Sequence, residues 1–151
     1  MIVGSFENLW QNHPQPSQIR TVLPTWPVGW EPCCAGMSHA MNMSNLPVAV
    51  ANPRRNFLYM GRSHYLAVQE MRDYLTRTYG DAENYRYEGA VVRIAIISQI
   101  TGRRGIIVFG HRHIDLWDGS NIHGHGFNLH SLWEAPSALH EGIFFWEVGG
   151  G

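Results

Sequence analysis

The chain has 151 residues, of which 44% are hydrophobic and 15% charged, and its formal net charge at pH 7 is -1. This composition excludes disordered and membrane-embedded proteins, and the length predicts a single domain over residues 1–151 with one buried core. All eleven basic residues are arginines, and their only runs are the pairs Arg54-Arg55 and Arg103-Arg104, so no basic stripe forms and nucleic-acid binding is excluded. No apolar run approaches the length of a membrane span.

The N-terminal part predicts one short helix followed by an irregular loop. Ser5 can cap a helix over residues 6–12, and Pro14 marks its end. Residues 14–32 hold five of the eight prolines, so this segment can neither continue a helix nor lie inside a sheet. We expect it to wrap the core as a loop and to deliver the chain to Cys33.

Two further helices are predicted in the middle of the chain. Residues 33–44 place apolar side chains at helical spacing, so that Cys33 opens a helix. Ser63 can cap a long amphipathic helix over residues 65–79, which Gly80 ends. Both helices precede the strands predicted for the second half, and this order is typical of an α+β arrangement.

The second half of the chain predicts an antiparallel sheet. Residues 91–97 (VVRIAII) and 143–148 are apolar runs that predict strands. Between them, residues 106–109 predict a buried strand and residues 113–117 its hairpin partner, with a turn at 118–119.

The second strand of this hairpin gives a histidine a rigid support. Ile114 and Leu116 point to one face of the strand, and His113, Asp115 and Trp117 point to the other. An imidazole at the start of a strand is well placed to transfer protons, provided that a nucleophile lies nearby in the fold.

A nucleophile is available at Cys33. A cysteine in the first turn of a helix lies where backbone amides and the helix dipole favour the thiolate. Such a thiolate needs an acid–base partner, which an imidazole from a separate element can supply, and His113 is our candidate. We interpret the neighbouring Cys34 as a small buried core residue.

Two segments resemble a known family, the type VI secretion system amidase effectors of the fourth cell-wall amidase class. CCAGMSHAMN, residues 33–42, resembles the nucleophile helix of that family, and HIDLWDG, residues 113–119, resembles its catalytic-histidine strand. FENLW, residues 6–10, and MRDYLTRTYG, residues 71–80, are also similar. The resemblance therefore spans most of the chain in the same order.

The resemblance implies a papain-like, NlpC-type fold, in which N-terminal helices with the catalytic Cys33 pack on a C-terminal antiparallel sheet. It implies a cysteine amidase that hydrolyses the D-glutamyl–meso-diaminopimelate bond of peptidoglycan stem peptides. Cys33 carries over as nucleophile and His113 as base. Such a thiolate mechanism needs no metal or cofactor.

The same resemblance implies an antibacterial effector that is secreted into the periplasm of target bacteria. The start, MIVGSFENLW, lacks the regions of a conventional signal peptide, which fits synthesis in the cytoplasm and export by an injection machine. A toxin of this kind implies a cognate immunity protein, whose expected target is the cleft between Cys33 and His113.

The third catalytic residue stays open at this point. The family keeps an aspartate in a cysteine-flanked loop after the WDG, whereas SNIHGHG, residues 120–126, contains neither residue type. Asp118 is the first choice, because it is the acid nearest to this loop and a carboxylate best orients an imidazole. His123 and Asn121 are the alternatives, since the third group need only accept one hydrogen bond.

Two other functions are compatible with the sequence. A zinc-dependent hydrolase could use the histidine-rich part of the chain, although no carboxylate has a supporting spacing. Its candidate ligands are His111, His123, His125 and His130. A non-enzymatic cell-wall-binding module could instead stack tryptophans on its ligand. The candidates are Trp26, Trp30, Trp117 and Trp133.

Overall fold

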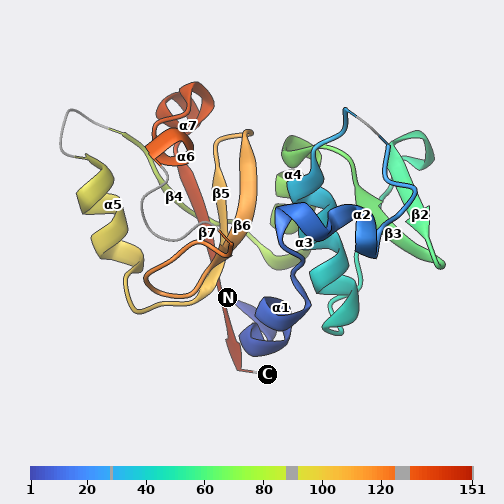
Figure 1. The fold of residues 1–151 in the computed structure, drawn as a ribbon. Coiled ribbons are helices and arrows are strands. Elements are labelled where there is room, and N and C mark those ends of the chain that lie inside the picture. The colour runs from blue at the N-terminus through green and yellow to red at the C-terminus, as the bar shows by residue number, and fades with distance from the viewer. Residues whose placement is uncertain (28, 88–91, 125–129, 151) are drawn as a thin grey trace.

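The computed structural model describes residues 1–27, 29–87, 92–124 and 130–150, and their central feature is one sheet with helices packed on both faces (Figure 1). The arrangement is α+β, as predicted. The strands follow the order β1-β7-β5-β6, and β4 also pairs with β7. Their bounds are β1 Ile2–Gly4, β4 Glu83–Tyr85, β5 Gly105–Phe109, β6 His113–Trp117 and β7 Ile143–Gly150. β1 runs parallel to β7, so the sheet is not purely antiparallel.

The predicted hairpin is confirmed, and its register sets the position of the site. Phe109 lies opposite His113, and Ile107 lies opposite Asp115. Ile114 and Leu116 belong to the core on one face of the sheet, whereas Trp117 belongs to the core on the other. Because β6 ends the strand order, side chains on it can reach past the edge of the sheet.

Three helices cover the first face of the sheet: α1 Phe6–Asn12, α3 Pro32–Met43 and α4 Val68–Tyr79. The predicted helix at 6–12 is confirmed with its cap, since the Ser5 hydroxyl accepts a hydrogen bond from the Asn8 N–H at 3.2 Å. Pro32 occupies the first turn of α3, where its missing N–H costs nothing.

The predicted start of the long helix is wrong. Ser63 lies in β3 (Arg62–Tyr65), which forms a two-stranded hairpin with β2 (Asn56–Tyr59), and α4 begins only at Val68. The carboxylate of Glu31 accepts a hydrogen bond from the Val68 N–H at 2.8 Å. This helix start therefore depends on a residue 37 positions earlier in the chain, which no local pattern reveals.

The strand predicted at 91–97 is also wrong, because residues 92–97 lie in helix α5, Val92–Ile100. Ile96 and Ile100, four residues apart, are buried against the second face of the sheet, whereas Ile94 is exposed. A short apolar run has no periodicity that separates a buried strand from a helix, and packing on the sheet decides. Two short helices, α6 His130–Trp133 and α7 Pro136–Glu141, cover the same face.

The proline-rich segment is irregular as predicted, apart from two short helical turns, η1 Pro16–Gln18 and α2 Ile19–Val22. A third turn, η2 Pro53–Arg55, precedes β2. Within the parts of the chain that the structure describes, none of the helices has the length and apolar character that crossing a membrane requires.

Candidate active site

Cys33 lies in the first turn of α3, as the sequence predicts. Its side chain is half-buried, and its thiol is free. Cys34 is fully buried and belongs to the core between α3 and the sheet. The two thiols thus face different surroundings, and Cys33 is the one that lines a pocket.

His113 opens β6 and faces the same pocket, with 16% of its side chain exposed. The Cys33 thiol lines the same pocket and interacts electrostatically with the ring, which brings together the two residues that the sequence singled out. The other side of the ring contacts Asp115, with 2.8 Å between His113 Nε2 and Asp115 Oδ2. Asp115 is buried and lies two residues further along the strand, so the two side chains share a face.

Asp118, the first choice for the third residue, lies in a turn. Its Oδ1 accepts hydrogen bonds from the backbone N–H groups of Ser120 (2.9 Å) and Asn121 (2.6 Å), a common use of aspartate in turns. The exposed Asn121 side chain bonds Ser120. The geometry therefore favours Asp115 over Asp118 as the group that orients His113. The strand alternation already placed Asp115 beside His113, and it was the signal that could have identified this residue.

The surroundings of Cys33 and His113 set the charges of these two side chains. The pKa of the Cys33 thiol lies well below its ordinary value, because hydrogen bonds from the Cys34 thiol and the His113 ring stabilise the thiolate more than burial disfavours it. Burial also disfavours the charged ring of His113. The hydrogen bonds to Asp115 and Cys33 outweigh this cost and raise the pKa of His113 to about 9. The two shifts favour a thiolate–imidazolium pair at neutral pH.

This ionisation predicts an unusual pH dependence of alkylation. We expect iodoacetamide to modify Cys33 rapidly at neutral pH and at pH values well below the ordinary pKa of a thiol. Because the pKa is lowered, the thiolate is lost only when the pH falls through that lowered value. Peptide mass spectrometry after timed alkylation measures the rate. Cys34 is the internal control, since burial raises the pKa of its thiol. Equal labelling of both cysteines would contradict the assignment.

The pocket that exposes these groups has a volume of about 200 Å³. Its walls come from the proline-rich segment, the start of α3 and the hairpin. They include Pro14, Ile19, Glu31, Pro32 and Arg112.

Two further histidines line this pocket, and the sequence singled out only one of them. His123 follows β6, and His13 directly follows α1. Burial lowers the pKa of His13 to about 4, so its ring is neutral at pH 7. Together with Asp115 these histidines form a group that could hold a metal ion. His13 was missed because only the fold brings it to the hairpin.

The other proposed metal ligands do not join this group. His111 bonds Glu141 on α7, His125 lies outside the described residues, and so does the side chain of His130. Of the four tryptophans considered for wall binding, three are buried in the core. They are Trp26, Trp117 and Trp133. Trp30 is 37% exposed and lies under the guanidinium of Arg55.

Comparison with known proteins identifies a family and a fold. The family model of the type VI secretion system (T6SS) amidase effector protein 4, Tae4, matches residues 30–146. The crystal structure of Tae4 from Enterobacter cloacae has a TM-score of 0.67 and 18% sequence identity, covering 96% of each chain. No curated protein matches the chain significantly.

Two similar solved structures are complexes. Tae4 from Salmonella typhimurium, bound to the immunity protein Tai4 from Enterobacter cloacae, has a TM-score of 0.64 and 21% identity, covering 96% of this chain and 99% of that chain. The Tae4–Tai4 effector–immunity complex from Enterobacter cloacae has a TM-score of 0.65 and 16% identity, covering 96% and 98%. At these identities the likeness establishes the fold alone.

Proposed function

The chain belongs to the Tae4 family of type VI secretion system amidase effectors, and from this premise we propose that it cleaves peptidoglycan stem peptides by a cysteine mechanism. The observation that carries the proposal is the meeting of Cys33, His113 and Asp115 in one pocket. A thiolate at a helix start, facing an imidazole on a strand, is the papain-like arrangement of these groups.

The first half of the proposed reaction forms an acyl-enzyme. The Cys33 thiolate attacks the carbonyl carbon of the scissile amide, and a C–S bond forms. The backbone N–H of Cys33, in the first turn of α3, can stabilise the negative charge that develops on the carbonyl oxygen. His113 then donates its proton to the leaving nitrogen, the C–N bond breaks, and a thioester remains.

The second half restores the enzyme. Water attacks the thioester while the now neutral His113 accepts a proton from it, and the C–S bond breaks to release a carboxylic acid. Asp115 keeps Nε2 of His113 engaged throughout, which leaves Nδ1 as the nitrogen that exchanges the proton. Asp115 is thus a positioning residue, and it also stabilises the charged ring.

The proposed substrate bond is the D-glutamyl–meso-diaminopimelate linkage, whose two residues both carry free carboxylates. Arg112 lines the pocket next to His113 and can pair with such a carboxylate. We expect Arg112→Gln to raise KM by roughly fivefold with little change in kcat, since a surface-exposed charged contact contributes on the order of 1 kcal/mol. Steady-state hydrolysis of a purified stem peptide measures both constants. A selective loss of kcat would contradict a binding role.

A thiolate mechanism also predicts how the enzyme can be stopped. We expect hydrolysis to survive strong chelators and to be abolished by alkylation of Cys33, because no step needs a metal. Assays of the same preparation after dialysis against chelator, and after iodoacetamide, provide the comparison. Loss of activity with chelator that zinc restores would instead favour a zinc hydrolase.

We further propose that the protein acts in the periplasm of target bacteria and that the producing cell makes an immunity protein against it. The support is family membership, together with the relatives solved as Tae4–Tai4 complexes. The expected contact is the pocket between Cys33 and His113, because covering it blocks the substrate.

A further inference from the structure

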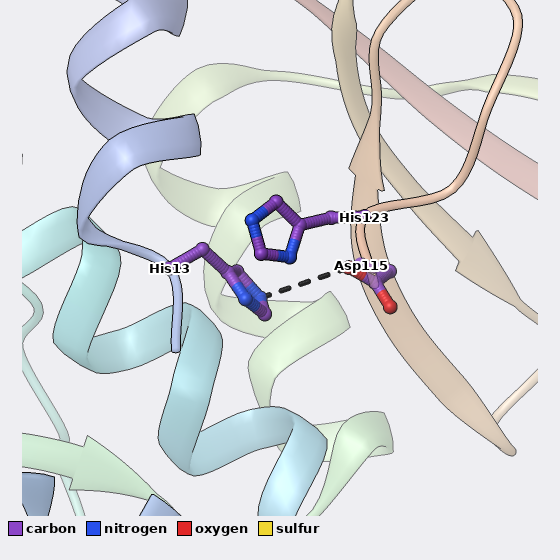
Figure 2. Close-up of side chains that lie close together, drawn as sticks. All are labelled: His13, Asp115 and His123. Atoms are coloured by element: carbon purple, nitrogen blue, oxygen red, sulfur yellow. Dashed lines mark ion pairs between the residues drawn. The ribbon is translucent and has the colours of Figure 1, made fainter. Parts of the chain in front are cut away.

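Three side chains that could ligate a metal ion converge from three parts of the chain (Figure 2). All three line the pocket that also holds Cys33 and His113. His13 comes from the end of α1, Asp115 from β6, and His123 from the segment after β6. One ligand atom of each lies within 4.8 Å of the others. All three residues are buried, with exposed fractions of 9%, 2% and 5%.

Backbone carbonyls fix the orientation of both rings. Nδ1 of His13 lies 3.0 Å from the Pro14 carbonyl oxygen, and Nε2 of His123 lies 3.1 Å from the Trp10 carbonyl oxygen. A carbonyl only accepts, so each of these nitrogens carries the N–H. The lone pairs therefore lie on Nε2 of His13 and Nδ1 of His123. Metal-binding histidines in proteins are held in the same way, with the outer N–H donated to a carbonyl or carboxylate.

A hydrogen bond between His13 and Asp115 does not explain why these two side chains lie close together. Nε2 of His13 lies 3.7 Å from Oδ1 of Asp115, which is too long for a hydrogen bond. Among the described residues, this buried nitrogen has no hydrogen-bond partner. A 3.7 Å separation is close to the ~3.3–3.4 Å between two ligands of a tetrahedral zinc ion with bonds of about 2.0–2.1 Å.

We propose that His13, Asp115 and His123 bind a single zinc ion. Two imidazole nitrogens and one carboxylate oxygen are a donor set that suits zinc, and three protein ligands leave a fourth position open. All three residues line the pocket that exposes Cys33, so an ion can enter from solvent. This site differs from the zinc site considered from the sequence. It uses His13 and Asp115, and it depends on neither His111 nor the residues beyond His123.

Zinc in this site competes with the amidase reaction, a consequence that rests on the proposed function. Asp115 faces His113 through Oδ2 and the proposed zinc through Oδ1. A dication on this carboxylate draws its charge away from the imidazolium and repels that ring. Zinc is therefore an inhibitor of the enzyme and takes no part in catalysis.

The decisive experiment is calorimetric titration of zinc into the full chain carrying Cys33→Ser, which removes the thiolate as a competing ligand. We expect one zinc per chain. His13→Gln or His123→Gln in this background should weaken binding on the order of 100-fold or more, since each removes one of three ligands. His111→Gln is the matched control, because His111 bonds Glu141 instead, and it should bind zinc as before. Absence of binding, or equal binding by all variants, would overturn the proposal.

A second measurement keeps all three proposed zinc ligands in place. Nitrogen-15 spectra of the histidines in the Cys33→Ser chain should show Nε2 of His13 and Nδ1 of His123 shifting on zinc addition, while His111 stays unchanged. Shifts confined to other histidines would contradict the site. Both measurements use a chain without its nucleophile, so they do not depend on amidase activity. In the active enzyme, zinc inhibition that persists in His13→Gln would rule out the competition through Asp115.

Discussion

Replacing Cys33 by alanine is expected to abolish hydrolysis of stem peptides while the protein stays folded. In the proposed mechanism this side chain provides the attacking thiolate, and a helix start tolerates alanine at a half-buried position. Loss of a catalytic nucleophile typically removes most of the rate enhancement, on the order of 10⁶ in kcat for the serine of subtilisin. Release of a new amino group from a purified stem peptide measures turnover, and circular dichroism monitors the fold.

Cys34→Ala is the matched control for this substitution. Its side chain lies in the core, where the change to alanine removes little volume, and we expect most of the turnover to remain. The pKa of Cys33 should rise in this variant, because the Cys34 thiol no longer stabilises the thiolate. Full activity of Cys33→Ala would exclude Cys33 as the nucleophile, and equal loss from both substitutions would remove the distinction between the two cysteines.

Replacing Asp115 by asparagine is expected to lower kcat by about 10²–10⁴-fold in metal-free buffer and to leave KM nearly unchanged. The substitution keeps the size of the side chain but removes the charge that supports the His113 imidazolium. The pKa of His113, measured by NMR titration, should fall from its raised value in the same variant. A purely structural role for Asp115 would leave that pKa in place.

A substitution of Asp118 is the comparison for the Asp115 variant. Asp118→Ala removes the acceptor of two backbone N–H groups in the turn, so we expect a loss of about 1 kcal/mol in the free energy of unfolding and little change in kcat. Thermal unfolding and turnover of the two variants separate the roles. A loss of kcat in the Asp118 variant with none in the Asp115 variant would return the orienting role to Asp118.

The sequence predicted those parts of the fold whose signals are local. The capped helix at 6–12, the opening of α3 at Pro32 and the β5–β6 hairpin each follow from a cap, a proline or an alternating pattern within a few residues. Cys33 and His113 were predictable for the same reason. Each occupies the start of a regular element, and the resemblance to an effector family linked the two.

Contacts between distant residues explain what the sequence did not predict. Helix α4 begins at Val68 because Glu31 caps it, and α5 is a helix because the sheet buries Ile96 and Ile100. His13 joins Asp115 only when the end of α1 reaches the hairpin. The alternation of β6 already placed Asp115 on the face of His113, but the resembled family keeps its acid after the WDG, and this favoured Asp118.

Mass spectrometry of digested stem-peptide fragments is the most direct test of the proposed hydrolysis of a peptidoglycan peptide bond by Cys33 and His113. Purified muropeptides are incubated in parallel with the wild-type chain and with Cys33→Ala, and the products are sequenced by fragmentation. We expect the wild type to separate D-glutamate from meso-diaminopimelate with the gain of one water, and Cys33→Ala to yield no products. Intact muropeptides after wild-type digestion, or identical products from both proteins, would contradict it.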